Sequence, residues 1–272
     1  MRISNTRQFV LKEFMVLKYL QEHGDNLIKR SIPKPIALHR FGSRYISSQN
    51  YIQAAKFKPP SWFDLKKKTI VEKHFDYLIR WLQSLWQVPT KGLTKKNVKG
   101  IDIFAELEFC FARCNGDSKE FYRKILSVAE DLHARNLPLV LNHNDLCLEN
   151  IFFDLRSVRV IDWELSYLTL PIFDWFYFTV NYAHRFWSGK DRSMASFVKA
   201  VKRAFFECNW FSELVKNQTK TIYDTMQIDT SLIPLFYCLG IFDFFYRKYF
   251  PELIDLGDCA PLFRLEELLL AN

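Results

Sequence analysis

The sequence predicts an α+β fold with a small mixed N-terminal part and a larger, mainly helical part. Three observations favour this class. Apolar residues recur at helical spacing over residues 6–22 and again in long stretches after residue 70. Two short apolar runs around the turn RFGSR predict a hairpin over residues 36–52. The apolar, β-branched runs IFF (151–153) and VRVI (158–161) predict a second hairpin inside the helical part, and the second run ends just before Asp162.

The first 57 residues are predicted to form a partial N-terminal lobe, built from one helix and one hairpin. The helix covers residues 6–22, and Gly24 predicts where it stops. The strands of the hairpin are expected at residues 36–41 and 44–52. A lone two-stranded sheet is marginally stable in water, so its edge is expected to be exposed and to allow self-association.

Residues 58–272 are predicted to form the larger lobe, which is mostly helical. The stretch 232–246 is its longest apolar run, but Pro234, Gly240 and Asp243 interrupt it and it is shorter than the roughly 20 residues that a bilayer requires. It predicts a buried helix rather than a membrane span. The helices expected in this lobe cover residues 70–87, 121–136, 171–187, 193–216, 231–247 and 262–271.

Composition indicates a globular protein with no nucleic-acid site. The chain has 272 residues, 49% of them hydrophobic, and a net charge of +8, which favours anionic ligands but also describes many ordinary surfaces. The basic runs at 66–68 and 94–99 lack the interleaved aromatic residues of a nucleic-acid platform. Six cysteines without paired spacing predict free thiols, and the N-terminus does not resemble a signal peptide, so a cytoplasmic location is expected.

The polar residues of the segment LNHNDLCLENIFFDLRSVRVIDWE (141–164) point to chemistry. The two predicted strands are flanked by His143, Asp145, Asn150 and Asp162, and their pairing would bring these side chains close together. Asn150 and Asp162 offer oxygen ligands for Mg²⁺, and Asp145 could deprotonate a hydroxyl as a general base. Taken singly, these residues could also shape turns, and His143 could be a satisfied core histidine. The ordered set favours phosphoryl transfer, which needs mainly positioning and charge neutralisation.

HNDLCLEN followed by VIDWE resembles the catalytic loop and metal-binding segment of the aminoglycoside phosphotransferase and choline kinase family. These are small-molecule kinases with a protein-kinase-like fold that use ATP and Mg²⁺. The resemblance implies that His143 braces the loop and that Asp145 is the catalytic aspartate. It also implies that Asn150 and Asp162 hold Mg²⁺, and that Asp174 supports the loop from the following helix.

The resemblance also suggests nucleotide contacts upstream and shows two departures. Glu13 fits the helix glutamate that pairs with a lysine or arginine in the family, and the adenine is expected near the linker residues Gln49, Tyr51 and Gln53. Cys147 stands where the family usually has a second histidine. Only twelve residues precede Glu13, and they contain no glycine-rich turn. The chain is therefore expected to be truncated at its N-terminus.

Two functions remain open. The first is ATP-dependent phosphorylation of a hydroxyl on a small polar molecule, such as a sugar, an amino alcohol or an aminoglycoside. The alternative is a catalytically impaired binding or scaffold protein that lacks the phosphate-covering strands. The intact set of Asp145, Asn150 and Asp162 favours the first, and the missing strands favour the second. The aromatic residues after Asp162 could line an acceptor pocket, although apolar core is their commoner use: Trp175, Tyr177, Tyr182, Trp187 and Trp210.

Overall fold

The computed structural model describes residues 6–42, 44–50, 52, 67–91, 93, 139–153, 157–189 and 191–244. It divides the chain into two compact units. The first unit comprises residues 1–101 and 139–178, and the second comprises residues 102–138 and 179–272. The lobe boundary predicted after residue 57 falls outside the described residues, so it remains a prediction.

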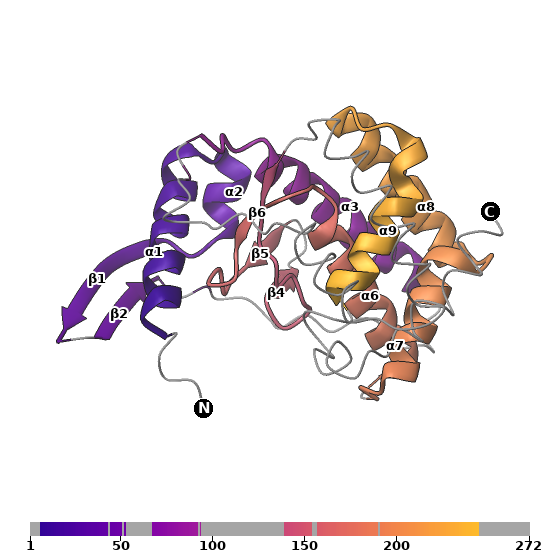
Figure 1. Ribbon diagram of the computed structural model, residues 1–272, viewed down its shortest axis with the longest axis horizontal. Helices are drawn as coiled ribbons and strands as arrows, with labels where there is room; N and C mark the ends of the chain where they lie inside the picture. Colours follow the sequence, from indigo (N-terminus) through magenta and orange to yellow (C-terminus); the bar gives the residue numbers. More distant parts are fainter. Residues whose placement is uncertain are drawn as a thin grey trace, which may run out of the picture. The chain divides into compact units, whose positions relative to one another are not determined.

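The first unit begins with two helices and a hairpin, namely α1 (Thr6–His23), α2 (Asn26–Ser31), β1 (Pro35–Phe41) and β2 (Arg44–Gln49) (Figure 1). The predicted helix and hairpin are confirmed, whereas α2 was not predicted. Between the two helices, Gly24 is required, because an added Cβ would lie 2.6 Å from the carbonyl oxygen of Leu20. The Asp25 side chain then caps α2 by accepting the Ile28 N–H at 2.8 Å.

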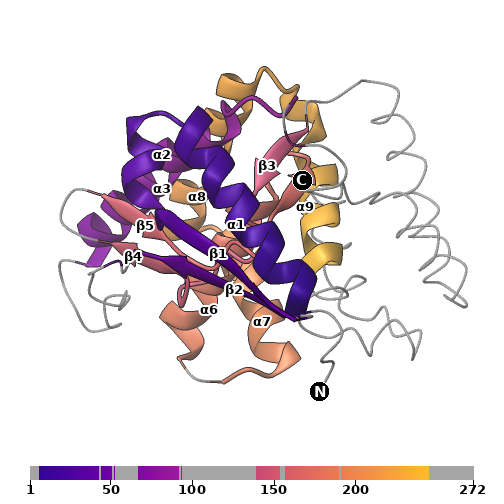
Figure 2. The ribbon, with the colours of Figure 1, turned by 90° about the vertical axis from the view of Figure 1, so that its left-hand side faces the viewer.

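The hairpin lies along α1, with which both of its strands are in contact (Figure 2). β1 and β2 run antiparallel, and within the described residues their sheet has no third strand. Its large apolar side chains are left open to solvent, since Ile36, Phe41 and Ile46 are 65%, 62% and 54% exposed. The exposed sheet that the sequence predicted thus also presents apolar side chains; self-association through its edge remains a prediction.

Elsewhere in its described residues, the first unit has a long helix, two further strand pairs and the start of a second long helix. The predicted helix α3 (Lys67–Trp86) is present, and it contacts β3 and β5. The predicted pair of β4 (Ile151–Phe153) and β5 (Val158–Val160) is confirmed and is antiparallel. A further antiparallel pair, which was not predicted, joins β3 (Val140–Asn142) to β6 (Tyr167–Thr169).

A buried aromatic cluster holds α3 against these strands. The rings of Trp81 and Trp163 are fully buried, with centroids 6.0 Å apart. Trp81 also donates its indole N–H to the Ser31 hydroxyl at 2.8 Å, which ties α3 to α2. Full burial of two such side chains contributes about 3 to 6 kcal/mol of hydrophobic stabilisation. The packing of Trp163 on Trp81 therefore holds the segment that contains Trp163 against α3.

The second unit is helical in its described part. The division between the units falls inside α6 (Phe173–Ser188), after Phe178. The prediction of one continuous helix over residues 193–216 is wrong, because Glu207 to Asn209 interrupt it and Asn209 caps the next helix by accepting the Ser212 N–H at 3.0 Å. The remaining elements are α7 (Met194–Val201), a π-helical turn (Lys202–Phe206), α8 (Trp210–Met226), a 3₁₀ turn (Thr230–Leu232) and α9 (Ile233–Phe242).

The apolar run at 232–246 forms the buried helix α9 over Ile233–Phe242. Across the described residues, none of the helices combines the length and the apolar character needed to cross a membrane. The helices predicted at 121–136 and 262–271 lie outside the described residues.

Candidate active site

His143 lies directly after β3, with its ring completely buried. Its Nε2 atom is 2.8 Å from the carbonyl oxygen of Ile161, and its Nδ1 atom accepts the backbone N–H of Asp145 at 3.2 Å. A carbonyl can only accept and a backbone N–H can only donate, so these contacts require a neutral ring with its proton on Nε2. The rings of His143 and Trp163 also form a T-shaped pair, with their centroids 4.8 Å apart. His143 thus joins the loop after β3 to the segment that leads into Asp162.

Asp174 stabilises the same loop through hydrogen bonds to its backbone. It lies in the first turn of α6 and is completely buried. Its two oxygens accept the backbone N–H groups of His143 at 2.6 Å and Asn144 at 2.7 Å. Asn144 has a φ of 65°, in the left-handed region that a non-glycine residue rarely adopts. The carboxylate therefore stabilises a loop backbone that would otherwise be disfavoured.

Asp145, at the centre of the loop, is half-buried, and both of its carboxylate oxygens are engaged. Asn150 donates its side-chain amide to Oδ2 at 2.9 Å, and the Tyr177 hydroxyl donates to Oδ1 at 2.9 Å. The Asp145 carbonyl also accepts the Asn150 amide at 2.9 Å and the Cys147 N–H at 2.8 Å. A carboxylate has about four lone-pair sites, so two remain for a substrate.

Asn150 and Asp162 present oxygen atoms close to this carboxylate. The amide nitrogen of Asn150 faces Asp145, and no described residue donates to its amide oxygen. Asp162 is partly exposed and has a φ of 66°. Such backbone strain costs of order 1 to 3 kcal/mol and is typical of functional positions. Partial burial, and then the nearby Asp145 charge, raise the pKa of Asp162 above its usual range.

Glu13 brings a further carboxylate from α1. Its Oε1 atom accepts the backbone N–H of Trp163 at 3.3 Å. Burial raises the pKa of Glu13 above its ordinary value; the Trp163 hydrogen bond opposes this shift, and the charges of Asp162 and Glu164 add to it. The helix that carries Glu13 is thereby tied to the segment directly after Asp162, a contact that the sequence did not predict.

Two charged residues that sequence reasoning missed complete this region. Burial raises the pKa of Glu164, and the charges of Asp162 and Asp145 add to the effect. Burial also lowers the pKa of Lys12 to about 8, against the opposing influence of Glu164. We call Glu13, Asp145, Asp162 and Glu164 the carboxylate cluster. Lys12 is next to the predicted site residue Glu13 in sequence, and Glu164 is two positions after Asp162; this closeness was the available signal.

Tyr177 was considered only as a pocket or core residue, yet its hydroxyl reaches Asp145. It follows Asp174 by three residues on a helix, a spacing that places both side chains on one face.

Of the three residues predicted to lie near the adenine, the structure describes Gln49. Gln49 is exposed at the end of β2, and Tyr51 and Gln53 lie outside the described residues.

A magnesium site fits Asn150 and Asp162. Among the described residues, no three His, Cys, Asp or Glu side chains converge as a complete metal-binding set. Mg²⁺ does not need such a set, because it usually takes one or two carboxylates together with phosphates and water. The amide oxygen of Asn150, to which no described residue donates, and the carboxylate of Asp162 match the oxygen ligands that such an ion takes.

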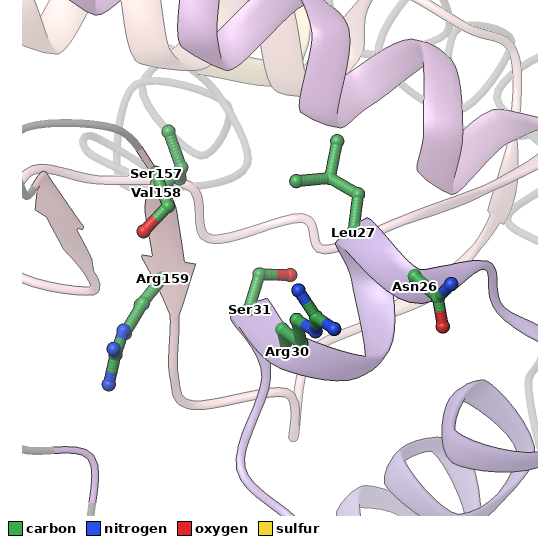
Figure 3. A pocket seen from close by; sticks show the side chains of 7 residues that line it. All are labelled: Asn26, Leu27, Arg30, Ser31, Ser157, Val158 and Arg159. Carbon is green, nitrogen blue, oxygen red and sulfur yellow. The ribbon is translucent and has the colours of Figure 1, made fainter.

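A separate cavity of about 470 Å³ lies between α2 and the strand β5 (Figure 3). None of the candidate active-site residues lines it. In Figure 3 the side chain of Arg159 extends away from that of Arg30, so the two guanidinium groups do not converge on one anion. The residues that line this cavity are Asn26, Leu27, Arg30, Ser31, Ser157, Val158 and Arg159.

Comparison with known proteins places this site in context. The model of a family described as "phosphotransferase enzyme family" matches residues 1–210. A choline kinase, LicA from Streptococcus pneumoniae, is similar in structure, with 14% identity over 99% of this chain and 84% of its own, at a TM-score of 0.53. A putative aminoglycoside phosphotransferase from Ralstonia eutropha has 14% identity over 86% and 71% of the two chains, at a TM-score of 0.56.

The amicoumacin kinase hAmiN, solved with AMP-PNP, Ca²⁺ and Ami, has 13% identity over 98% of this chain and 77% of its own, at a TM-score of 0.54. No curated protein sequence matches this chain significantly. At such low identity the structural similarities establish the fold, and they confirm the predicted protein-kinase-like α+β class.

Proposed function

Because this chain belongs to the phosphotransferase enzyme family, we propose that it transfers the terminal phosphoryl group of ATP to a hydroxyl of a small polar molecule. Its assignment as a phosphotransferase, made from the sequence, is confirmed by the family match. One observation carries the finer proposal. The Asp145 carboxylate is held by hydrogen bonds at both oxygens and lies next to the oxygen ligands of Asn150 and Asp162.

Asp145 would act as the general base. The acceptor hydroxyl would hydrogen-bond to one of the two remaining lone-pair sites on the carboxylate. As the hydroxyl oxygen bonds to the terminal phosphorus, the bond from phosphorus to the leaving nucleoside diphosphate oxygen breaks. The hydroxyl proton passes to Asp145 and then to solvent. His143 would maintain the loop geometry by joining Ile161 to Asp145, and Asp174 by holding the backbone of His143 and Asn144.

Asn150 and Asp162 would hold Mg²⁺ through their side-chain oxygens. The ion would supply positive charge against the phosphates when bound. Burial, and to a smaller extent the neighbouring carboxylates, raise the pKa values of Asp162 and Glu13, and a bound divalent cation would favour the ionised form of both groups. Glu13 would help to order the nucleotide-binding side of the site, and Gln49, Tyr51 and Gln53 are proposed to lie near the adenine.

The similar structures support the choice of substrates. Their descriptions name a choline kinase, a complex with AMP-PNP and a complex of streptomycin with ATP. A sugar, an amino alcohol or an aminoglycoside-like molecule is therefore the acceptor class that we propose. A cytoplasmic location, which gives access to ATP, suits this role.

The test is a transfer assay with γ-labelled ATP and Mg²⁺ on a panel of hydroxylated acceptors. We expect label on at least one acceptor with the wild-type chain and none with Asp145→Asn, which is the matched control. Binding of Mg²⁺–ATP without any labelled acceptor or released phosphate would contradict the proposal.

That outcome would instead support the second candidate, a nucleotide-binding scaffold without turnover. One observation favours it. Among the described residues no lysine or arginine forms an ion pair with Glu13, and the sheet beside α1 has two strands. Calorimetry with Mg²⁺–ATP, run beside the transfer assay, separates binding from turnover.

A further inference from the structure

We infer that Tyr177 is a positioning residue, which fixes the orientation of the Asp145 carboxylate through the 2.9 Å hydrogen bond from its hydroxyl to Oδ1. This inference rests on the proposed function of Asp145 as the general base. Tyr177 does not contact the reacting atoms itself. It acts through Asp145.

The position of Tyr177 on α6 explains how it reaches the base. Asp174 and Tyr177 are one helical turn apart, so their side chains project from the same face of the helix. Asp174 accepts the backbone N–H groups of His143 and Asn144, while Tyr177 donates to the side chain of the next residue, Asp145. The first two turns of α6 therefore hold both the backbone of the loop and the carboxylate that projects from it.

The carboxylate plane is defined by two donors on different elements. Asn150 donates to Oδ2 from the end of the loop, and Tyr177 donates to Oδ1 from α6. With one donor alone, the carboxylate could rotate about its Cβ–Cγ bond, because that torsion is broad. With two donors, rotation would break at least one charge-assisted hydrogen bond, each roughly twice as strong as a neutral one. The lone pairs left for the acceptor then have a fixed direction.

An ordinary core role for Tyr177 makes a different prediction. The side chain is 5% exposed and lies in the apolar sequence FDWFYF, which is typical of packing. Replacing Tyr by Phe keeps the ring and removes only the hydroxyl. If packing were its whole role, Tyr177→Phe would leave the turnover of folded protein unchanged.

The experiment compares Tyr177→Phe with Tyr237→Phe in the full chain. Tyr237 is a matched control because its buried hydroxyl also donates to one side chain, Thr219 Oγ1 at 3.4 Å, and it lies in the second unit. The assay measures phosphate release from Mg²⁺–ATP with water as the acceptor. For Tyr177→Phe we expect kcat to fall about tenfold, the usual effect of losing one hydrogen bond to a charged group, with the KM for ATP unchanged. Tyr237→Phe should retain wild-type kcat.

A second measurement does not depend on activity. The side-chain carboxyl ¹³C resonance of Asp145, assigned by its absence in Asp145→Asn, should shift in Tyr177→Phe and not in Tyr237→Phe. An unshifted resonance, or a wild-type kcat in Tyr177→Phe, would overturn the inference. If the wild-type chain neither releases phosphate nor labels an acceptor, the proposed function fails, and the resonance still decides whether Tyr177 holds the carboxylate.

Discussion

The loop that carries Asp145 and the segment that carries Asp162 lie in the same unit but are stabilised in opposite ways. In the loop, hydrogen-bond donors from Asn150 and Tyr177 surround the carboxylate, and the backbone rests on the buried Asp174. The segment after β5 contains Asp162, whose φ of 66° matches the 65° of Asn144 in the loop, and the Trp163 N–H in this segment donates to Glu13 at 3.3 Å. The conformation of the loop is therefore stabilised by hydrogen bonds within the protein.

The same contrast is seen in the electrostatics. The pKa values of Glu13, Asp162 and Glu164 are all raised, first by burial and then by one another or by Asp145. Each shift means that ionisation destabilises the folded state. We propose that a bound cation would offset this cost at Asp162, whereas the hydrogen bonds that hold the Asp145 carboxylate come from the protein itself. The following predictions test this difference.

The largest effect is expected for Asp145→Asn. The amide keeps the shape of the side chain but removes the proton acceptor, so turnover should fall by about 10²- to 10⁴-fold. The affinity for Mg²⁺–ATP should change little, because the proposed metal ligands Asn150 and Asp162 remain. Steady-state rates and calorimetry on the same preparation check both statements. A variant with wild-type turnover would remove Asp145 from the mechanism.

Asp174→Ala should give the largest loss of stability. It leaves the buried N–H groups of His143 and Asn144 without acceptors, at about 1 to 3 kcal/mol for each donor. Urea unfolding should show a loss of about 2 to 6 kcal/mol for the two donors together. Asp174→Asn is the milder control, because its amide oxygen can still accept one of the two N–H groups. Equal stability of the two variants and the wild type would show that the loop does not depend on this carboxylate.

The loop could be predicted from the sequence because its spacing is local. Asn150 precedes the strand Ile151–Phe153 and Asp162 follows the strand Val158–Val160, and pairing of these strands brings the two side chains to the same end. The order of residue types then indicated the chemistry. Such features depend on strand alternation and short turns, which a sequence displays directly.

The contact between Tyr177 and Asp145 could not be predicted in this way. It joins residues 32 positions apart, and a tyrosine within an apolar helical stretch is usually core. The break at Glu207 was missed because apolar periodicity continues on both sides of it, although Asn209 followed by Ser212 was a usable capping signal. The helix α2 was missed because six residues are too few to show a period.

A third prediction concerns the packing that supports β4. Burial lowers the pKa of His74 to about 4, and its ring lies 4.6 Å from that of Phe153. Since the pKa is lowered on folding, the contribution to stability is present above pH 6.5 and is lost as the pH falls towards 4. The change amounts to about 3 kcal/mol at most. Unfolding free energies of His74→Phe between pH 6.5 and 4 should show a flatter slope than the wild type; an identical slope would contradict the assignment.

Asp162→Asn should have two effects if this carboxylate holds Mg²⁺ as proposed. The affinity for Mg²⁺–ATP should fall at least about tenfold, as happens even when outer partners of a metal are removed. Without divalent cations, the variant should be more stable than the wild type at pH 7. The pKa of Asp162 is raised in the folded protein, so its favourable contribution is present below pH 3.8 and is lost as the pH rises through the folded value.

The stability difference between Asp162→Asn and the wild type should therefore grow as the pH rises from about 4 to 7. Unfolding in EDTA at both pH values checks this sign, and calorimetry checks the affinity. Asn150→Ala serves as a comparison, since it should weaken binding less and should not give the pH-dependent gain. A wild-type affinity in both variants would argue for turn-forming residues and no metal site.

The smallest effect is expected at Cys147, which lies in the loop beside the base and occupies the place of a family histidine. Burial, and then the charges of Asp145 and Glu149, raise the pKa of its thiol to about 12. At pH 8 only about one molecule in 10⁴ would carry the thiolate, which is the reactive form. Cys147 should therefore resist iodoacetamide while the exposed Cys208 reacts, as peptide mapping can show.

Since the thiol stays protonated, Cys147→Ser should keep turnover within about twofold, the change of a single weak hydrogen bond. A larger loss in Cys147→Ser, or equal labelling of the two cysteines, would mean that this position takes part in the chemistry of the loop.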